Sequence, residues 1–155
     1  MKSFYKNIHF CRNKSKHILT ITKRNLQKYA ESNIEKQTLK SSSTVISFSR
    51  DGKKDSYLIF VTLHGGPGSH KDFRYFSKAL TDNIPSCQLI RYDLPGYADS
   101  ERGGLKPTSK EFADRIIESL TTLDVLGNLS KKVIIIGHSL GSHIATDVKL
   151  QLYFF

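Results

Sequence analysis

The chain has 155 residues, of which 38% are hydrophobic and 25% charged. This length suits one globular domain, and the composition excludes a collagen, a disulfide scaffold and a disordered chain. Two cysteines, Cys11 and Cys87, are too few for a disulfide framework, so we expect a reducing compartment. The apolar runs are too short to cross a bilayer, and no transmembrane segment is predicted.

The net charge of +10 is concentrated at the N-terminus. Residues 1–30 hold eight Lys and Arg side chains and no acid, whereas the rest of the chain carries sixteen basic and fourteen acidic side chains. A nucleic-acid-binding domain would spread its basic residues over the folded elements. The sequence therefore predicts no nucleic-acid partner.

The basic segment, rich in hydroxyl residues and Asn, has the composition of a mitochondrial transit peptide. A solvated basic arm and a membrane-surface helix fit the same composition. Residues 31–44 are polar and indicate a linker. We therefore expect residues 1–44 to be a disordered or targeting segment, the location to be mitochondrial or cytoplasmic, and the folded domain to cover residues 45–155.

From residue 45 onward the pattern alternates strands and helices. The predicted strands are residues 45–48, 57–63, 87–92 and 133–136. The runs 57–63 and 133–136 are continuously apolar, which is typical of strands buried on both faces. The predicted helices are residues 72–80, with Phe73, Phe76 and Leu80 on one stripe, residues 108–126, and a segment after residue 139.

The helix at 108–126 has the clearest signals. Thr108 and Glu111 have capping-box spacing, and Gly127 supplies a stop. Strands separated by helices of this length imply right-handed crossovers. The predicted class is α/β, with a mostly parallel sheet and helices on both faces.

The strongest chemical motif is a G-x-S-x-G sequence between the strand 133–136 and the following helix. Its residues are Gly137, His138, Ser139, Leu140 and Gly141. In a nucleophile elbow the serine sits on a sharp, strained turn that exposes its hydroxyl, and the glycines remove side chains that would collide. We predict that Ser139 is a nucleophile and that the N–H of Leu140 stabilises an oxyanion.

A glycine-rich loop follows the strand 57–63. It reads His64, Gly65, Gly66, Pro67, Gly68 and Ser69. Bare glycines let a backbone approach a ligand closely, and in a fold with a nucleophile elbow such a loop supplies the second oxyanion N–H. We assign that donor to Gly66, with Gly65 as the second choice. The loop is not a phosphate loop, because no Gly-Lys-Ser/Thr follows it.

Asp93 ends the strand 87–92 and opens a loop that runs to Ser100. Because His64 ends a neighbouring strand, we interpret Asp93 and His64 as a structural pair that braces the two loops. His70, at the end of the glycine loop, is expected to line the pocket or to face water.

In this order and spacing, His-Gly-Gly-Pro-Gly, Asp-x-x-Gly-x-x-x-Ser and Gly-His-Ser-Leu-Gly resemble the α/β-hydrolase superfamily over about residues 45–150. The first motif is similar to that of proline iminopeptidases. Epoxide hydrolases have a related loop but use an aspartate nucleophile, where this chain has Ser139. The resemblance implies an eight-stranded, mostly parallel sheet, a Ser–His–Asp triad and no cofactor.

In this superfamily the acid and the histidine follow the serine on loops after later strands. After Ser139 the sequence holds one acid, Asp147, and one histidine, His143, both within the predicted elbow helix. His143 is the best local substitute for the base, and His138 should point elsewhere. We therefore expect the N-terminal half of a hydrolase domain, nearly inactive by itself.

The leading hypothesis is a serine hydrolase that acts on small-molecule esters or amides, with no cofactor and no metal site. The alternative is a non-catalytic relative that binds a ligand or a partner. An apolar strand 133–136 left without a second neighbour would favour edge-to-edge self-association.

Overall fold

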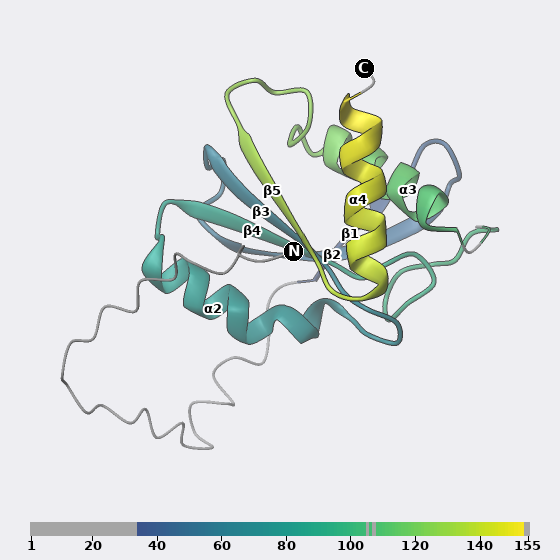
Figure 1. The fold of residues 1–155 in the computed structure, drawn as a ribbon, viewed down its shortest axis with the longest axis horizontal. Helices are drawn as coiled ribbons and strands as arrows, with labels where there is room; N and C mark the ends of the chain where they lie inside the picture. The colour runs from purple at the N-terminus through teal and green to yellow at the C-terminus, as the bar shows by residue number, and fades with distance from the viewer. Residues whose placement is uncertain (1–33, 105, 107, 154–155) are drawn as a thin grey trace, which may run out of the picture.

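The computed structural model describes residues 34–104, 106 and 108–153. The elements in chain order are β1 (Ile34–Thr38), β2 (Val45–Gly52), β3 (Leu58–Leu63), η1 (His70–Phe73), α2 (Arg74–Asn83), β4 (Cys87–Tyr92), α3 (Ser109–Thr122), β5 (Lys132–Gly137) and α4 (Leu140–Tyr153). The strands form one sheet in the order β1-β2-β4-β3-β5, shown in Figure 1.

The sheet is mostly parallel, as predicted. β3 pairs in parallel with β4 and with β5, whereas β2 is antiparallel to both β1 and β4. Among the described strands, β2 therefore runs against the other four. The carboxyl ends of β3, β4 and β5 consequently meet at one edge of the sheet, where an α/β protein places its site.

Helices cover both faces, with α2 on one side of the sheet and α3 and α4 on the other (Figure 1). Ile59, Val61 and Leu63 face the larger core under α3 and α4, while Phe60 joins a smaller cluster with Cys87 beneath α2. This two-sided burial explains why residues 58–61 are all apolar rather than alternating with polar ones, whereas Tyr57 lies before β3 and is 64% exposed.

The first predicted helix starts later than its apolar stripe suggests. A 3-10 turn, η1, comes first, because Ser69 and Asp72 form a reciprocal capping box at its start. α2 then begins at Arg74, and Phe76 is 39% exposed rather than packed on the sheet. Leu80 does pack against the smaller core cluster.

α3 starts as predicted, with the Thr108 hydroxyl accepting a hydrogen bond from the N–H of Glu111 at 3.2 Å. It ends at Thr122, before the predicted stop at Gly127. Asp124 adopts a left-handed φ of 55° and reverses the chain. Aspartate tolerates this conformation better than most residues. The sequence pattern did not predict that the helix would end here.

The expected linker contains a strand, so the described part of the sheet begins at residue 34 instead of 45. β1 pairs along its whole length with β2, and Glu35 forms an ion pair with Arg50. Its side chains alternate between exposed and half-buried. A polar strand with charged side chains is typical of a sheet edge, and it lacks the apolar pattern that predicts interior strands. Residues 1–33 of the segment 1–44, which is expected to be disordered or targeting, lie outside the described residues.

At the other edge of the sheet, β5 pairs with β3 and with no further strand among the described residues. Ile134 is 36% exposed. On the α4 side of β5 there is an open groove lined by Leu126, Val133, Ile135, Ala145, Lys149 and Leu152. Within the described structure the apolar strand therefore lies at an edge, as expected for a strand without a second neighbour, and it is not buried on both faces.

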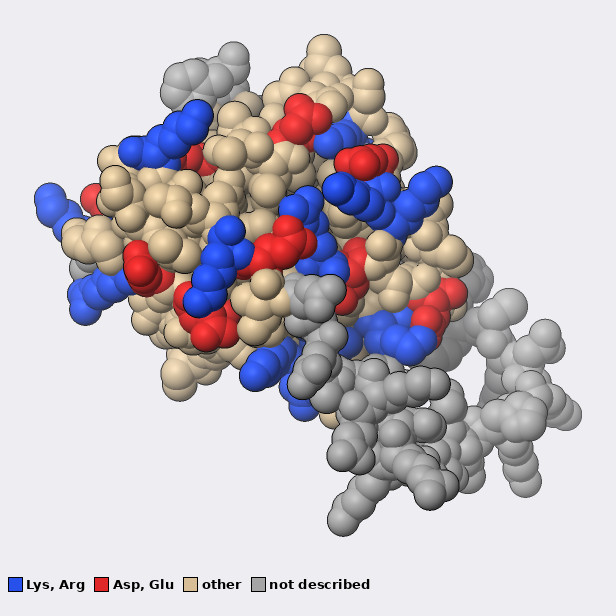
Figure 2. Space-filling model, turned by 180° about the vertical axis from the view of Figure 1, so that it is seen from behind, with Lys and Arg blue, Asp and Glu red and all other residues tan. Residues whose placement is uncertain are grey.

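Lys and Arg side chains are interspersed with Asp and Glu on the face shown in Figure 2. Some ion pairs join residues one helical turn apart, such as Lys110–Asp114 at 3.1 Å. No helix of the described chain is both long and apolar enough to span a membrane. The described residues also contain no cluster of three or more His, Cys, Asp or Glu side chains suited to a metal ion.

Candidate active site

Ser139 is the second of two residues, after His138, that connect the end of β5 at Gly137 to the start of α4 at Leu140. Its φ is 51°, in the left-handed region that non-glycine residues rarely adopt. The residue is exposed. The predicted strained strand-to-helix turn at this serine is therefore confirmed as a backbone feature.

Gly137 and Gly141, on either side of Ser139, are required because other backbone atoms lie too close to leave room for a side chain. A Cβ atom on Gly137 would collide with the backbone of Gly141 and Ser142, and one on Gly141 would collide with the carbonyl group of Leu63. Gly137 therefore lets the chain fold back on itself, and Gly141 lets α4 start directly against β3. The elbow depends on the sterics of these glycines.

The glycine loop lies directly beside the elbow. A Cβ placed on Gly65 would lie 3.0 Å from Nδ1 of His138 and 3.1 Å from Cβ of Ser139, while one on Gly66 would lie 2.9 Å from the hydroxyl of Tyr97. The N–H of His138 also donates to the carbonyl of Leu63 at 3.0 Å, at the start of this loop. The fold thus brings two motifs together that are more than sixty residues apart in the sequence.

The two predicted oxyanion donors are the N–H of Leu140, which follows Ser139 in the chain, and the N–H of Gly66, which follows the glycine that lies against the elbow. Leu140 opens α4, so its N–H has no partner within the helix and lies at the positive end of the helix dipole. Gly66 is exposed, whereas Gly65 is buried. This exposure favours Gly66 over Gly65 as the donor, and the oxyanion role of Leu140 and Gly66 stays a prediction. Pro67 is exposed, and Gly68 packs against His64 and Asp72.

His64 is fully buried and ties the glycine loop to the loop after β4. The N–H of Leu94 donates to its Nε2 at 2.9 Å, which assigns the proton to Nδ1, and Nδ1 donates to the carbonyl of Gly65 at 2.6 Å. Burial lowers the pKa of His64 below its ordinary value of 6.5, although the hydrogen bond to Gly65 and the charge of Asp93 oppose this. His64 is therefore held neutral.

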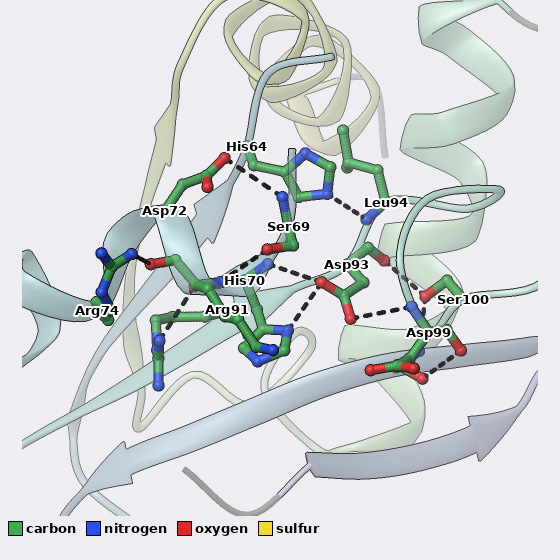
Figure 3. Close-up of polar contacts among 12 residues, drawn as sticks. His64, Ser69, His70, Asp72, Arg74, Arg91, Asp93, Leu94, Asp99 and Ser100 are labelled. Atoms are coloured by element: carbon green, nitrogen blue, oxygen red, sulfur yellow. Dashed lines mark hydrogen bonds and ion pairs between the residues drawn. The ribbon is translucent and has the colours of Figure 1, made fainter. Parts of the chain in front are cut away.

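Asp93 does not pair with His64, which corrects the predicted brace. Its Oδ1 accepts hydrogen bonds from the backbone N–H of His70 at 2.7 Å and from the Nδ1 of His70 at 2.9 Å (Figure 3). Burial tends to raise the pKa of Asp93, but the hydrogen bonds from His70 outweigh it and hold that pKa below its ordinary value. The two loops are braced, but by a different histidine.

The position of His70 differs from both predictions made for it. It is only 2% exposed, so it neither faces water nor lines an open pocket. The guanidinium of Arg91 donates to the carbonyl of His70 at 3.0 Å, which holds the main chain of His70 from a second side. One sequence signal was available for this contact. β3 and β4 are parallel neighbours, Asp93 follows β4, and His70 follows β3 by a few residues, so the two side chains come from the same edge of the sheet.

The remaining histidines near the elbow are exposed. His138 lies on the turn and His143 on the first turns of α4, while Asp147 is half-buried further along that helix. Among the described residues, no histidine or carboxylate forms a hydrogen bond with the hydroxyl of Ser139. The described part of the chain therefore presents a serine and neighbouring backbone donors without an assigned general base.

Comparisons with known proteins agree with this geometry. Residues 59–148 match the sequence profile of the alpha/beta hydrolase fold. Mouse protein phosphatase methylesterase 1 is 25% identical over 112 residues. The crystal structure of Cfl2 from Burkholderia cenocepacia has a TM-score of 0.66 at 21% identity, and the epoxide hydrolase CorEH has 0.65 at 25% identity.

The matches cover most of this chain but a minor part of each relative. The methylesterase match covers 72% of this chain and 27% of the methylesterase. The Cfl2 match covers 77% and 37%, and the CorEH match covers 78% and 38%, of this chain and of the relative respectively. The matched profile covers more than half of the sequence and includes the glycine loop, Asp93 and the elbow. The chain belongs to the α/β-hydrolase fold family.

Proposed function

We propose that the chain carries the nucleophilic half of a serine hydrolase that cleaves esters or amides through an acyl-enzyme. The observation that supports this most is the exposed Ser139 at φ 51° between β5 and α4. A strained backbone at an exposed serine costs stability, and such strain clusters at functional sites. Nothing in the packing of the turn requires a serine hydroxyl there.

In the proposed reaction, Oγ of Ser139 attacks the acyl carbon while its proton passes to a base. The carbonyl oxygen becomes an oxyanion that accepts hydrogen bonds from the N–H groups of Leu140 and Gly66. As the tetrahedral intermediate collapses, the base gives its proton to the leaving group, which departs as a neutral alcohol or amine and leaves the acyl group on Ser139. Water releases the acid by the reverse sequence of proton transfers.

The relatives support a hydrolase and leave the substrate open. One relative is named a methylesterase, which agrees with ester cleavage, and another is an epoxide hydrolase. Epoxide hydrolases use an aspartate as the nucleophile, whereas this chain has Ser139 at the elbow. We therefore favour acyl transfer over epoxide opening.

The rate expected for the described residues alone is low. A serine hydroxyl without a general base is a weak nucleophile at neutral pH. Loss of the triad histidine costs a serine protease on the order of 10⁶ in turnover, while an oxyanion hole and binding leave roughly 10³–10⁴ over water. We propose that full activity needs an acid and a base beyond those described here.

A fluorophosphonate probe tests the nucleophile directly. The protein, its S139A variant and the matched control S142A are incubated with the probe, and the labelled peptide is identified by mass spectrometry. Slow labelling at Ser139 is expected in the wild type and in S142A but not in S139A. Absence of labelling at Ser139 in the wild type would contradict the proposal.

A second candidate is a non-catalytic protein that associates through the free edge of β5, and the exposed Ile134 favours it. Two copies of this edge can pair antiparallel about a two-fold axis. Light scattering after gel filtration should then give a dimer that becomes monomeric in an I134K variant. A monomeric wild type would exclude this candidate.

A further inference from the structure

The buried pair of His70 and Asp93 is not used in the proposed reaction. His70 is 2% exposed and Asp93 is completely buried. The carboxylate oxygen Oδ1 accepts two hydrogen bonds from the same residue, one from its main chain and one from its ring. A buried carboxylate is costly unless it is hydrogen-bonded, and both of these hydrogen bonds lead to a residue at the end of the glycine loop.

Both members of the pair are held rigidly by further contacts. The N–H of Asp93 donates to the carbonyl of Ser47 at 2.9 Å, and Ser100 Oγ donates to the carbonyl of Asp93 at 2.7 Å. Arg91 donates to the carbonyl of His70 at 3.0 Å and is itself paired with Asp51 at 2.7 Å. The main chain of His70 is therefore fixed at both its N–H and its carbonyl group (Figure 3).

This fixed point lies at one end of the glycine loop. At the other end, His64 accepts a hydrogen bond from Leu94, the residue next to Asp93. The loop 64–69 is thus pinned at both ends to two consecutive residues after β4. Three of its six residues are glycines, which lose more conformational entropy on ordering than other residues. Such a loop keeps one shape only if its ends are fixed.

We propose that His70 and Asp93 are positioning residues that hold the glycine loop so that the N–H of Gly66 points at the acyl oxygen. This inference rests on the proposed serine-hydrolase function. Gly65 contacts the elbow at Ser139, so a displacement of the loop moves one oxyanion donor while Ser139 and Leu140 stay in place. The pair acts through the loop backbone and does not touch substrate.

Hydrogen exchange tests the positioning without requiring activity. The variants are H70A, H70N, which retains a side-chain N–H near the position of Nδ1, and the control S119A. Ser119 is equally buried, and its hydroxyl bonds the side chains of Tyr92 and Gln37 rather than a residue of the loop. H70A should speed exchange of residues 64–69 by about tenfold or more, H70N should restore slow exchange, and S119A should leave this peptide unchanged. Equal exchange in H70A and wild type would overturn the inference.

The second measurement separates this inference from the proposed function. Labelling by the fluorophosphonate is followed at several probe concentrations in the same variants. H70A should lower the maximal labelling rate by about tenfold or more, because it displaces a donor whose complete removal costs about 10²–10³ in turnover, with little change in the half-saturating concentration. H70N should recover most of the rate. Unchanged rates in H70A contradict the positioning role, whereas an unlabelled wild type refutes the proposed function and leaves hydrogen exchange to decide the positioning.

Discussion

The elbow and the glycine loop meet at one edge of the sheet, but they are held in place by different physics. The elbow around Ser139 is fixed by backbone sterics, because glycines at 137 and 141 allow contacts that no Cβ would permit. The loop 64–69 is fixed by buried polar side chains, chiefly His64, His70 and Asp93. The first device tolerates almost no change in residue size, whereas the second depends on charge and hydrogen bonding.

The largest effect is expected from breaking the steric device. In G141A the new methyl group would collide with the carbonyl oxygens of Leu63 and His64, neither of which can move without disrupting β3. We expect the free energy of unfolding to fall by about 3 kcal/mol or more, at the upper end of overpacking effects. Urea denaturation followed by circular dichroism measures this. The control G104A lies where a Cβ meets nothing within 4 Å, although its positive φ adds some strain, and it should lose much less.

Breaking the polar device should cost somewhat less. D93A leaves the N–H and the ring of His70 without their acceptor in a buried site. The expected loss is about 2–3 kcal/mol, since a buried donor without a partner retains its full desolvation penalty. D93N keeps an acceptor oxygen and should lose less. If D93A and D93N unfold at the same urea concentration, hydrogen bonding to His70 does not stabilise the loop.

A smaller effect of opposite sign should come from relieving the strain at the nucleophile. Glycine adopts a φ near 51° without the penalty of about 1–2 kcal/mol that an L-residue incurs. S139G should therefore be more stable than S139A by roughly 0.5–1 kcal/mol after the extra entropy of unfolded glycine is subtracted. Thermal unfolding compares the two variants. Ala98, at φ 46°, provides a site outside the elbow where A98G should give a similar gain.

The smallest effect concerns pH. The pKa of His64 is lower in the folded chain than its ordinary value of 6.5, so its stabilising contribution is present above that value and is lost as the pH falls below it. Wild type should lose melting temperature between about pH 7 and pH 5. The pKa of Asp93 is held below its ordinary 3.8, so its contribution is lost only at still lower pH.

An H64Q variant isolates this contribution. The amide oxygen of Gln can accept the N–H of Leu94 in place of Nε2, but the side chain does not titrate. The melting temperature of H64Q should therefore vary less than that of wild type over the same pH range. Parallel curves for the two proteins would show that the protonation of His64 does not limit stability.

The prediction from sequence succeeded where the signal is local or periodic. The positions of the apolar strands β3, β4 and β5 and the apolar stripe of α3 followed from local residue patterns, although β5 lies at an edge and is not buried. The prediction failed at β1, whose polar sequence depends on pairing with β2, and at the end of α3, where Asp124 turns the chain. In both cases distant contacts or a single backbone angle outweighed the pattern.

The sequence alone determined the fold class and the bend at Ser139, because the sterics of strand, glycine and helix are settled within a few neighbouring residues. Only the tertiary structure decided which histidine Asp93 binds, because His64 and His70 both follow β3 and lie within reach of the loop after β4. The choice depends on the direction of each side chain after packing, and no local pattern encodes that direction.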